Sequence, residues 1–283
     1  MTNIVFAGFG KLARSLASQF DSAEINLWGI ARTPLSINGI KTIMGDLSLP
    51  LDDQLTATDR QQLDQIDYVI VTLSPDEISD DSYQKTYWQS AKNITHFFSK
   101  TSKKPIIIYI SSTRVYAEND GEWVSEATQV TANNKKSESL IAAENEILAH
   151  NTKNIIVRFS GIYGGERQYL MKKVEAGIKV QKRPAQYTNR IHQEDCVGII
   201  CFLIKMLEQG ESLDSIYIGT DDDPATLLDV TNHIAKEFGY PKPTVIINDD
   251  DLAPKGKRCK NDKIKSLGYN FKYPSYKNGY RNR

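Results

Sequence analysis

A short apolar strand, a glycine-containing turn and an amphipathic helix follow one another without interruption at the start of the chain. Residues 4–7 are Ile-Val-Phe-Ala, and they pass directly into Gly-Phe-Gly-Lys-Leu-Ala at 8–13. After this turn Leu12, Leu16 and Phe20 recur every four residues, which places one apolar stripe along a helix. A strand that turns directly into a helix predicts a parallel sheet, because parallel strands need a crossover connection.

The turn has small residues at three positions, Gly8, Gly10 and Ala13. After a first strand, Gly8 permits a tight turn, Gly10 lets phosphates approach the backbone, and Ala13 lets the helix pack closely on the strand. The first helical turn then offers N–H groups and a positive dipole end to a phosphate. The pattern therefore predicts a dinucleotide site. We expect the cofactor to contact five residues of this turn: Gly8, Phe9, Gly10, Lys11 and Leu12.

Arg32 follows the second predicted strand, where an NAD-selective fold has an acidic residue for the ribose hydroxyls. A guanidinium at this position suits a 2′-phosphate, and Lys11 is a candidate second cation. We therefore expect NADP, with NAD less favoured; the alternative is that Arg32 only covers the adenine face. Further expected cofactor contacts follow later strands: Asp46, Leu47, Thr72, Leu73, Ser74 and Ser111.

Apolar runs with the length of strands recur along the first half of the chain, separated by amphipathic segments. The runs lie at 25–30, 67–73, 105–110 and 155–159, and the helical segments at 80–100 and 133–150. This alternation predicts an α/β fold, a Rossmann-like doubly wound parallel sheet with helices on both faces. Beyond residue 160 the alternation loosens, which favours a smaller C-terminal substrate lobe. The predicted domains are an NAD(P)-binding Rossmann domain over 1–160 and a substrate-binding lobe over 161–283, partly interleaved with the main sheet.

The second half contains two recognisable helices. Residues 196–207 are nearly all apolar and predict a fully buried helix. Thr226 is expected to cap another, which Gly239 would end. Two runs of three aspartates, 221–223 and 249–251, lack calcium-loop spacing. We interpret both runs as solvated loop caps and expect no metal.

The charge balance limits the partners. The 283 residues include 35 Lys and Arg and 35 Asp and Glu, so the formal net charge is zero. Nucleic-acid binding usually needs a basic excess, and no apolar run approaches the roughly 20 residues of a membrane span. Three cysteines match no zinc spacing, and a strand begins at the N-terminus. We therefore expect a cytoplasmic protein with reduced thiols and no signal peptide, which acts on a small molecule and binds neither nucleic acid nor membrane.

Four segments, in this order, resemble the extended and atypical short-chain dehydrogenase/reductases. They are the Gly-Phe-Gly turn at 8–10, Ser-Ser-Thr-Arg-Val-Tyr at 111–116, Arg-Phe-Ser-Gly-Ile-Tyr-Gly at 158–164 and Asn-Arg-Ile-His-Gln-Glu-Asp at 189–195. The tail is similar to the branch labelled NAD-dependent epimerase/dehydratase, YeeZ-like. The resemblance covers essentially the whole chain. It implies an NAD(P)-dependent oxidoreductase, epimerase or dehydratase acting on a carbohydrate-like or nucleotide-sugar substrate.

The resemblance also shows what is missing. In the family a Ser or Thr four residues before the Tyr of a Val-Tyr pair polarises the substrate oxygen, and here this residue is Ser112. A Tyr with a Lys four residues later then manages the proton. The apolar run that ends in Glu144 places Lys136 at the Tyr position and Leu140 at the Lys position, so this pair is absent. A literal Tyr-x-x-x-Lys at 169–173 lies far from the expected helix, and we interpret it as surface helix.

Three residues are candidates for the missing acid/base. Lys136 qualifies if burial favours its neutral form, although adjacent lysines usually mark a solvated helix start. Tyr116 and Tyr163 lie in segments that the family places near the nicotinamide, and for both the alternative role is packing. The missing pair also leaves a second function open, a non-catalytic NADP-binding sensor or scaffold. A third alternative is a redox-neutral isomerase or lyase that uses His192.

Arg190 and His192 are the candidate substrate-binding residues, because their segment closes the substrate cleft in the family. Arg190 suits an anionic group such as a diphosphate. His192 titrates near neutral pH, so an acid/base role is open; fixing loops by hydrogen bonds is the competing role.

The family resemblance further implies a homodimer packed through the helices at 80–100 and 133–150. Trp88, Ile94 and Phe97 are candidates for the apolar surface of that interface. Burial of the same side chains against their own sheet is the alternative.

Overall fold

The chain divides into two compact units. The computed structural model describes residues 1–20, 23–248 and 253–281. The first unit comprises Met1–Val115, Val130–Arg158 and Ile200–Ile216, and the second comprises Tyr116–Gln129, Phe159–Ile199 and Tyr217–Arg283. The chain therefore passes between the two units several times, and one of these passages lies beside residue 160, where the sequence predicts the boundary. The segment 116–129 groups with the C-terminal half, and 200–216 groups with the N-terminal half.

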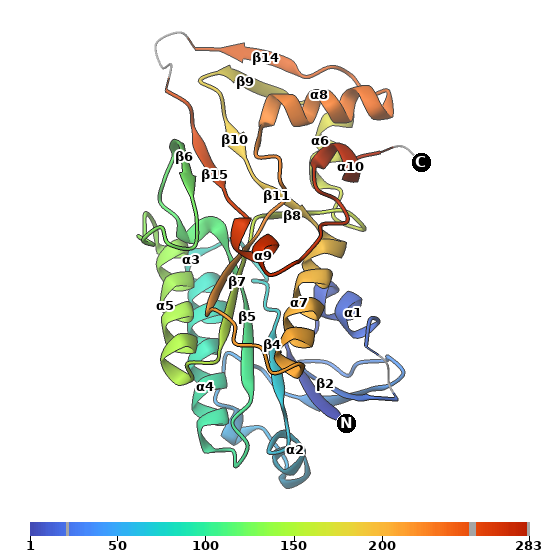
Figure 1. Cartoon of the computed structure of the whole chain (residues 1–283), viewed down its shortest axis with the longest axis vertical. Coiled ribbons are helices and arrows are strands. Elements are labelled where there is room, and N and C mark those ends of the chain that lie inside the picture. The colour runs from blue at the N-terminus through green and yellow to red at the C-terminus, as the bar shows by residue number, and fades with distance from the viewer. Residues whose placement is uncertain (21–22, 249–252, 282–283) are drawn as a thin grey trace. The chain divides into compact units, whose positions relative to one another are not determined.

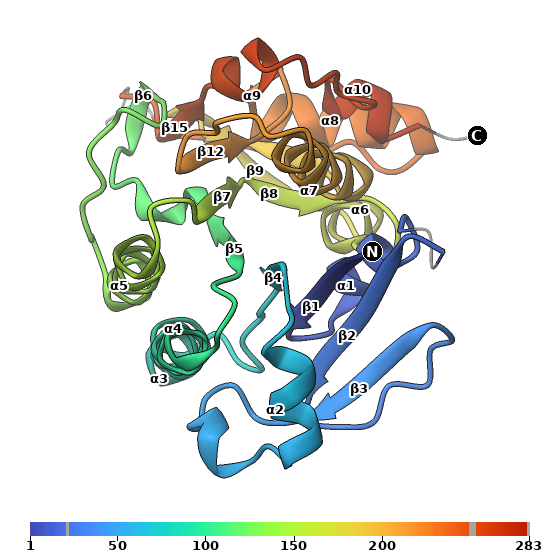
Figure 2. The ribbon, with the colours of Figure 1, turned by 60° about the horizontal axis from the view of Figure 1, so that its bottom comes forward.

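The described residues form a seven-stranded main sheet in the order β12-β7-β5-β4-β1-β2-β3 (Figures 1 and 2). The pairings β1–β2, β1–β4, β2–β3 and β4–β5 are parallel. Strand order reverses at β1, which is the doubly wound arrangement. The predicted Rossmann-like fold is therefore confirmed. The strands are β1 Thr2–Ala7, β2 Ile25–Ala31, β3 Ile40–Met44, β4 Tyr68–Val71, β5 Ile106–Ser112, β7 Ile155–Phe159 and β12 Ile216–Gly219.

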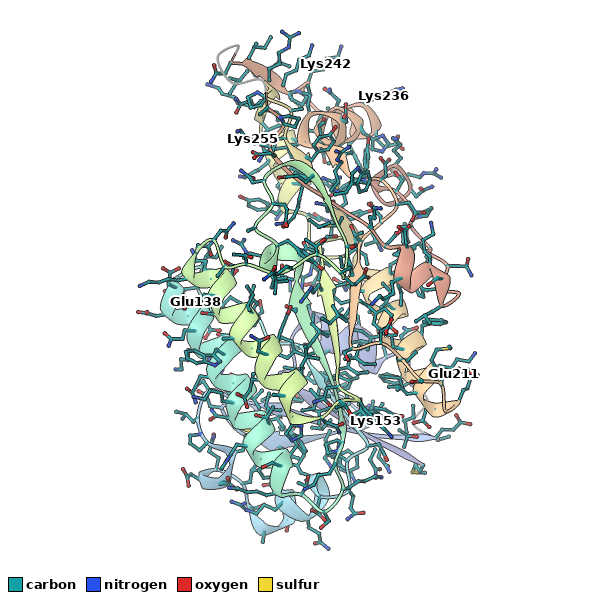
Figure 3. The ribbon with its side chains drawn as sticks, turned by 60° about the vertical axis from the view of Figure 1, so that its left-hand side comes forward. Glu138, Lys153, Glu211, Lys236, Lys242 and Lys255 are labelled. Carbon is teal, nitrogen blue, oxygen red and sulfur yellow. The ribbon has the colours of Figure 1, made fainter. Side chains whose placement is uncertain are left out.

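Alternate side chains of β1 pack on opposite faces of the sheet. Val5 belongs to a buried cluster with Ile94 and Ala143, whereas the ring of Phe6 packs edge-on against Phe9 at 5.4 Å between centroids. Helices α4 and α5 cover the first face, and α1 lies on the other (Figure 2). Figure 3 shows α4 and α5 side by side, with Glu138 of α5 on their solvent side. The three helices are α1 Lys11–Ala17, α4 Ser90–Lys100 and α5 Lys135–His150.

The helix expected at 80–100 is present but not uniform. It consists of α3 Asp80–Tyr83, a π-helical turn Gln84–Gln89, and α4. Ile94 is fully buried and Phe97 is 4% exposed, both in the core of the first unit, so for these two side chains the alternative of burial within their own unit is confirmed. Trp88 keeps 37% of its surface exposed. The homodimer stays a prediction.

The short elements of the first unit connect the strands. Thr56 caps α2, accepting a hydrogen bond from the Asp59 N–H at 3.1 Å. These elements are two 3₁₀ turns, Leu51–Asp53 and Thr113–Val115, and α2 Ala57–Leu63.

The second unit is built from short strand pairs and helices. The pairs β11–β8, β14–β9 and β15–β6 are parallel, and β10–β13 is antiparallel. Its strands are β6 Asp120–Val124, β8 Gly161–Tyr163, β9 Lys179–Arg183, β10 Tyr187–Thr188, β11 Arg190–His192, β13 Ala225–Thr226, β14 Thr244–Ile247 and β15 Gly256–Cys259. Its helices are α6 Tyr169–Glu175, α8 Leu227–Phe238, α9 Asp262–Ser266 and α10 Tyr276–Gly279.

Two predicted helices of the C-terminal half are present. Thr226 caps α8 by accepting from the Asp229 N–H at 3.1 Å, and Gly239 ends it with φ of 69°, so this prediction is confirmed. The apolar run forms α7 Gln193–Glu208, but the prediction that this helix is fully buried is wrong. Cys201 and Phe202 are half-buried and Lys205 is exposed, so one side of α7 is partly exposed. The described residues contain no helix with the length and apolar composition to cross a membrane.

A buried ion pair joins α5 to β7 in the first unit. The Arg158 guanidinium donates to both oxygens of Glu144, at 3.1 and 3.2 Å from Nε and 2.6 Å from Nη2. The two side chains are 3% and 2% exposed. Ser111 Oγ of β5 donates to the same carboxylate. Removal of one partner would leave a buried charge uncompensated, which costs much more than losing a surface pair.

We therefore expect Arg158→Met to lower the free energy of unfolding by about 3–5 kcal/mol, measured by urea denaturation. The matched control is Lys100→Met, which removes a half-exposed partner of Asp52 while Arg60 remains paired with that carboxylate. The control should change stability by less than about 1 kcal/mol. Equal losses in the two variants would contradict the interpretation.

Candidate functional site

A cavity of about 480 Å³ opens at the carboxyl ends of β1, β2 and β4 in the first unit. It lies where ligands bind in open parallel sheets, at the reversal of strand order. Residues that the sequence predicted as cofactor contacts form much of its wall: Gly8, Phe9, Gly10, Arg32, Asp46, Leu47, Thr72, Leu73 and Ser74. Parallel topology brings these loops to one edge, although they are distant in sequence.

Gly8 makes the turn that the sequence predicts. Its φ is 86°, in the region that glycine adopts without strain. A Cβ at this position would lie 2.8 Å from Leu73 Cδ2 and 3.3 Å from the Thr72 carbonyl oxygen. Thr72 Oγ1 also donates to the Gly8 carbonyl at 2.7 Å. The turn therefore packs directly against the end of β4.

Gly10 has the opposite environment. It is the N-cap of α1 and has no side-chain capping bond. A Cβ built there would meet no protein atom within 4 Å, although the residue lines the cavity. Open space over a backbone at this position fits a ligand phosphate, which approaches main-chain atoms closely. The open space over the Gly10 backbone, together with the cavity, thus fits the pyrophosphate of a dinucleotide.

Three other expected cofactor contacts do not line this cavity. Lys11 is exposed at the start of α1, and Leu12 is 7% exposed and packs into the core. Ser111 is 5% exposed and donates its hydroxyl to Glu144. Ala13 is fully buried, as close packing of helix on strand requires.

Arg32 forms an ion pair at the cavity wall. Its Nη1 and Nη2 donate to the two oxygens of Asp76, at 2.8 and 2.9 Å. The side chains are 63% and 67% exposed. The carboxylate raises the pKa of Arg32, and the guanidinium lowers the pKa of Asp76. Asp46 adds a second negative charge near Arg32. Its Oδ1 accepts from Ser48 N at 2.9 Å and from Ser48 Oγ at 2.6 Å.

Several wall residues were missed by the sequence reasoning. Asp76 follows β4 by a few residues, and its place after a parallel strand was a usable signal. Lys85 and Thr86 lie on the π-helical turn, which no helical periodicity reveals. The missed wall residues are Ile30, Ala31, Thr33, Gly45, Ser48, Asp76, Ser82, Lys85, Thr86 and Ser90.

Two candidate catalytic residues belong to the first unit. Ser112 ends β5, half-buried, and its Oγ accepts from the Arg114 N–H at 3.2 Å. Lys136 lies in the first turn of α5, with Nζ 3.7 Å from Asp80 Oδ1 and 6.0 Å from the Tyr83 ring centroid. Leu140, at the position where the family has its lysine, is 1% exposed. In the register that the resemblance implies, a buried leucine would thus stand where the family has its ribose-binding lysine.

The second unit has a cavity of its own, of about 620 Å³. Its wall comes from β8, α6, β10 and β11 and from the start of α8. The wall includes the candidates Tyr163 and Arg190, together with Arg167, Lys172, Asn189 and Tyr280. Three cations, Arg167, Lys172 and Arg190, therefore line the wall of one cavity.

Buried polar groups without partners cluster beside this cavity. Arg190 is 5% exposed, with Nη2 donating to Thr188 Oγ1 and Nη1 lacking a hydrogen-bond partner among the described residues. Tyr163, 4% exposed, likewise has no partner for its hydroxyl within the described chain, and burial raises its pKa far above 10. Unpartnered buried donors are costly, and functional sites are one place where they persist.

Asp221 corrects the expectation of solvated loop caps at 221–223. It is 1% exposed, its Oδ2 has no hydrogen-bond partner in the described structure, and burial raises its pKa to about 8 against the opposing effect of Arg190. Asp222 is exposed and bonds Lys265 at 2.9 Å. No metal-binding cluster of His, Cys, Asp or Glu occurs in the described residues. The run 249–251 lies outside them.

His192 and Tyr116 are enclosed in the second unit. His192 is 7% exposed, with its ring centroid 3.7 Å from that of Tyr273 in a tilted contact and 5.2 Å from that of Tyr163 in an edge-on contact. Its Nδ1 accepts from the Glu194 N–H at 3.2 Å, which supports the orienting role among the two that the sequence leaves open. Tyr116 is fully buried, and its carbonyl accepts from Lys257 Nζ.

Asp221 should make stability depend on pH. In the unfolded chain this carboxyl titrates near about 3.9, whereas in the folded chain its pKa is about 8. Between these values the folded state holds a proton that the unfolded state has released, so stability falls as pH rises and levels off above pH 8. Urea unfolding from pH 5 to 9 should show this fall in the wild type and not in Asp221→Asn. The exposed neighbour variant Asp222→Asn should keep the wild-type slope; an unchanged slope in Asp221→Asn would contradict the burial effect.

Comparison with known proteins bears on the fold. No protein-family model matches the chain, and the search of curated proteins found no match. Among solved structures, a candidate NAD-dependent epimerase/dehydratase from Methylobacillus flagellatus is 24% identical, with TM-score 0.81 over 99% of this chain and 96% of its own.

Two structures with bound cofactor are also similar. The human epimerase family protein SDR39U1 with NADPH is 12% identical, with TM-score 0.75 over 99% of this chain and 98% of its own. UDP-glucuronic acid 4-epimerase from Bacillus cereus with NAD is 18% identical, with TM-score 0.77 over 98% and 94%. The chain therefore has the Rossmann-like fold of these epimerase and dehydratase structures, as the resemblance in its sequence predicts.

Proposed function

We propose that this protein binds a pyridine nucleotide, NADP(H) in preference to NAD(H), and belongs to the short-chain dehydrogenase/reductases as an oxidoreductase, epimerase or dehydratase. The observation that carries the proposal is the cavity at the reversal of strand order, with the left-handed Gly8 and the uncovered Gly10 in its wall. Structures of the same fold hold NADPH or NAD. The substrate that we propose is carbohydrate-like or a nucleotide sugar.

Two side chains of this protein have proposed roles in the reaction, Ser112 and Arg190. When bound, the nicotinamide supplies or accepts a hydride. Ser112 Oγ is the group proposed to hydrogen-bond the substrate oxygen as its charge changes. Arg190 is proposed to hold an anionic part of the substrate, because Nη1 lacks a hydrogen-bond partner among the described residues.

Tyr163 is the most suitable of the three candidates for the proton. Its buried hydroxyl has no hydrogen-bond partner in the described part of the chain, so it can hydrogen-bond a substrate oxygen. Burial raises its pKa, which makes it a weaker proton donor until a bound group offsets that burial. Lys136 beside Asp80 has the contacts of a solvated helix start. Tyr116 is fully enclosed. We retain all three, because catalysis depends on reach to the substrate.

One observation favours a second function, a non-catalytic NADP-binding sensor or scaffold. The two positions of the family's acid/base pair hold Lys136 and the buried Leu140. Such a protein would keep the cofactor cavity and lose turnover. For both functions we propose a cytoplasmic location; no disulfide joins the three cysteines.

Calorimetry on the full chain should detect binding of NADPH, and more weakly of NADH. Arg32→Ala should weaken NADPH binding about tenfold or more, because a charge-assisted contact is worth roughly 1.5–3 kcal/mol, and should leave NADH within about twofold. Unchanged NADPH affinity in the variant would remove the NADP assignment. Absence of heat with either nucleotide, on folded protein, would remove the proposed cofactor.

Turnover distinguishes the two functions. With NADPH and a panel of aldehydes, ketones and nucleotide sugars followed by absorbance, Ser112→Ala should lower kcat about 100-fold or more, because it removes a hydrogen bond to the developing oxyanion. NADPH affinity should not change. The exposed control Ser99→Ala should behave as wild type. Binding without turnover on any substrate would support the sensor.

A further inference from the structure

The Arg32–Asp76 pair lies in the part of the cavity wall where this fold places the adenine ribose of a coenzyme. NADP and NAD differ only in the 2′-phosphate on that ribose. Each terminal nitrogen of Arg32 gives one N–H to one oxygen of Asp76, at 2.8 and 2.9 Å. This is the parallel, two-bond arrangement with which a guanidinium also binds a phosphate. The edge of Arg32 that is best suited to a 2′-phosphate therefore already holds a carboxylate.

The charges around this pair balance. Arg32 and Lys85 are the cations of the cavity wall, and Asp46 and Asp76 are its carboxylates. The two carboxylates act on Arg32, and Lys85 lowers the pKa of both of them. A ribose with free hydroxyls leaves this balance unchanged. A 2′-phosphate adds between one and two negative charges near neutral pH, since phosphate monoesters have a second pKa of about 6.

Resting on the proposed nucleotide binding, we propose that Asp76 sets the coenzyme preference by competing with the 2′-phosphate for Arg32. Binding of NADP(H) then displaces the Asp76 carboxylate from the guanidinium. Binding of NAD(H) leaves the pair intact. Asp76 thereby narrows the NADP preference that Arg32 alone would produce, and the protein accepts both coenzymes.

The exposure of the pair sets the size of the effect. The Arg32 and Asp76 side chains are 63% and 67% exposed, and such surface pairs are weak and screened by salt. A phosphate can therefore displace Asp76 at small cost. The expected effect of removing the Asp76 charge is a gain of about two- to fivefold in affinity for the phosphorylated ligand.

The test uses Asp76→Asn and a matched control. Glu77→Gln makes the same charge change one residue away, at an exposed side chain outside the cavity wall. Calorimetry at low, fixed ionic strength would compare 2′,5′-ADP with 5′-AMP, which differ only in the 2′-phosphate, and NADPH with NADH. Thermal unfolding would confirm that both variants fold, as expected for substitutions at exposed positions.

We expect Asp76→Asn to bind 2′,5′-ADP and NADPH about two- to fivefold more tightly, with 5′-AMP and NADH unchanged or weaker. Glu77→Gln should match the wild type for all four ligands. Weaker or unchanged binding of 2′,5′-ADP to Asp76→Asn would overturn the competition and make Asp76 a positioning residue for Arg32. Binding of neither NADPH nor NADH to the wild type would refute the proposed function itself, a result distinct from loss of selectivity alone.

Discussion

The contact between the Gly8 turn and the end of β4 is the constraint on which the cavity of the first unit depends. Thr72 Oγ1 bonds the Gly8 carbonyl at 2.7 Å, and any Cβ on Gly8 would collide with Leu73. This contact sets the distance between the ends of the neighbouring parallel strands β1 and β4. The start of α1 follows this turn, and the loop that carries Asp76 follows the end of β4. The positions of both wall segments therefore depend on the left-handed conformation of Gly8.

Local patterns in the sequence were sufficient for the fold and for one side of the cavity. The turn, the first strands and the Thr226 cap each depend on residues within one or two helical turns, and the structure has all of them. The full burial expected for α7 failed because apolar composition does not show which side of a helix faces water. Asp221 was misjudged for a similar reason: it is 1% exposed, and its N–H donates to the carbonyl of Arg190, a residue distant in sequence.

The residues of the second cavity show why the candidate chemistry was harder to predict. Arg190 and Tyr163 are buried with hydrogen-bonding atoms unpartnered within the described chain, and no sequence pattern states whether a polar atom finds a partner. His192 could be read as an acid/base or as an orienting residue. Its ring contact with Tyr273 and the hydrogen bond that it accepts from the Glu194 N–H supply information that the sequence lacked.

The π-helical turn Gln84–Gln89 has a consequence for how this chain tolerates change in length. Such a turn holds one residue more than an α-helix needs, and it carries Lys85 and Thr86 into the cavity wall. Deletion of a single residue there would let the helix close into regular α geometry, with the residues on both sides of the turn keeping their faces. The same deletion within α4 would rotate everything on one side by about 100° and turn the buried face of α4 to the wrong side. A one-residue change in length should therefore disturb the core less within this turn than within α4, at the expense of the side chains that the turn carries into the cavity wall.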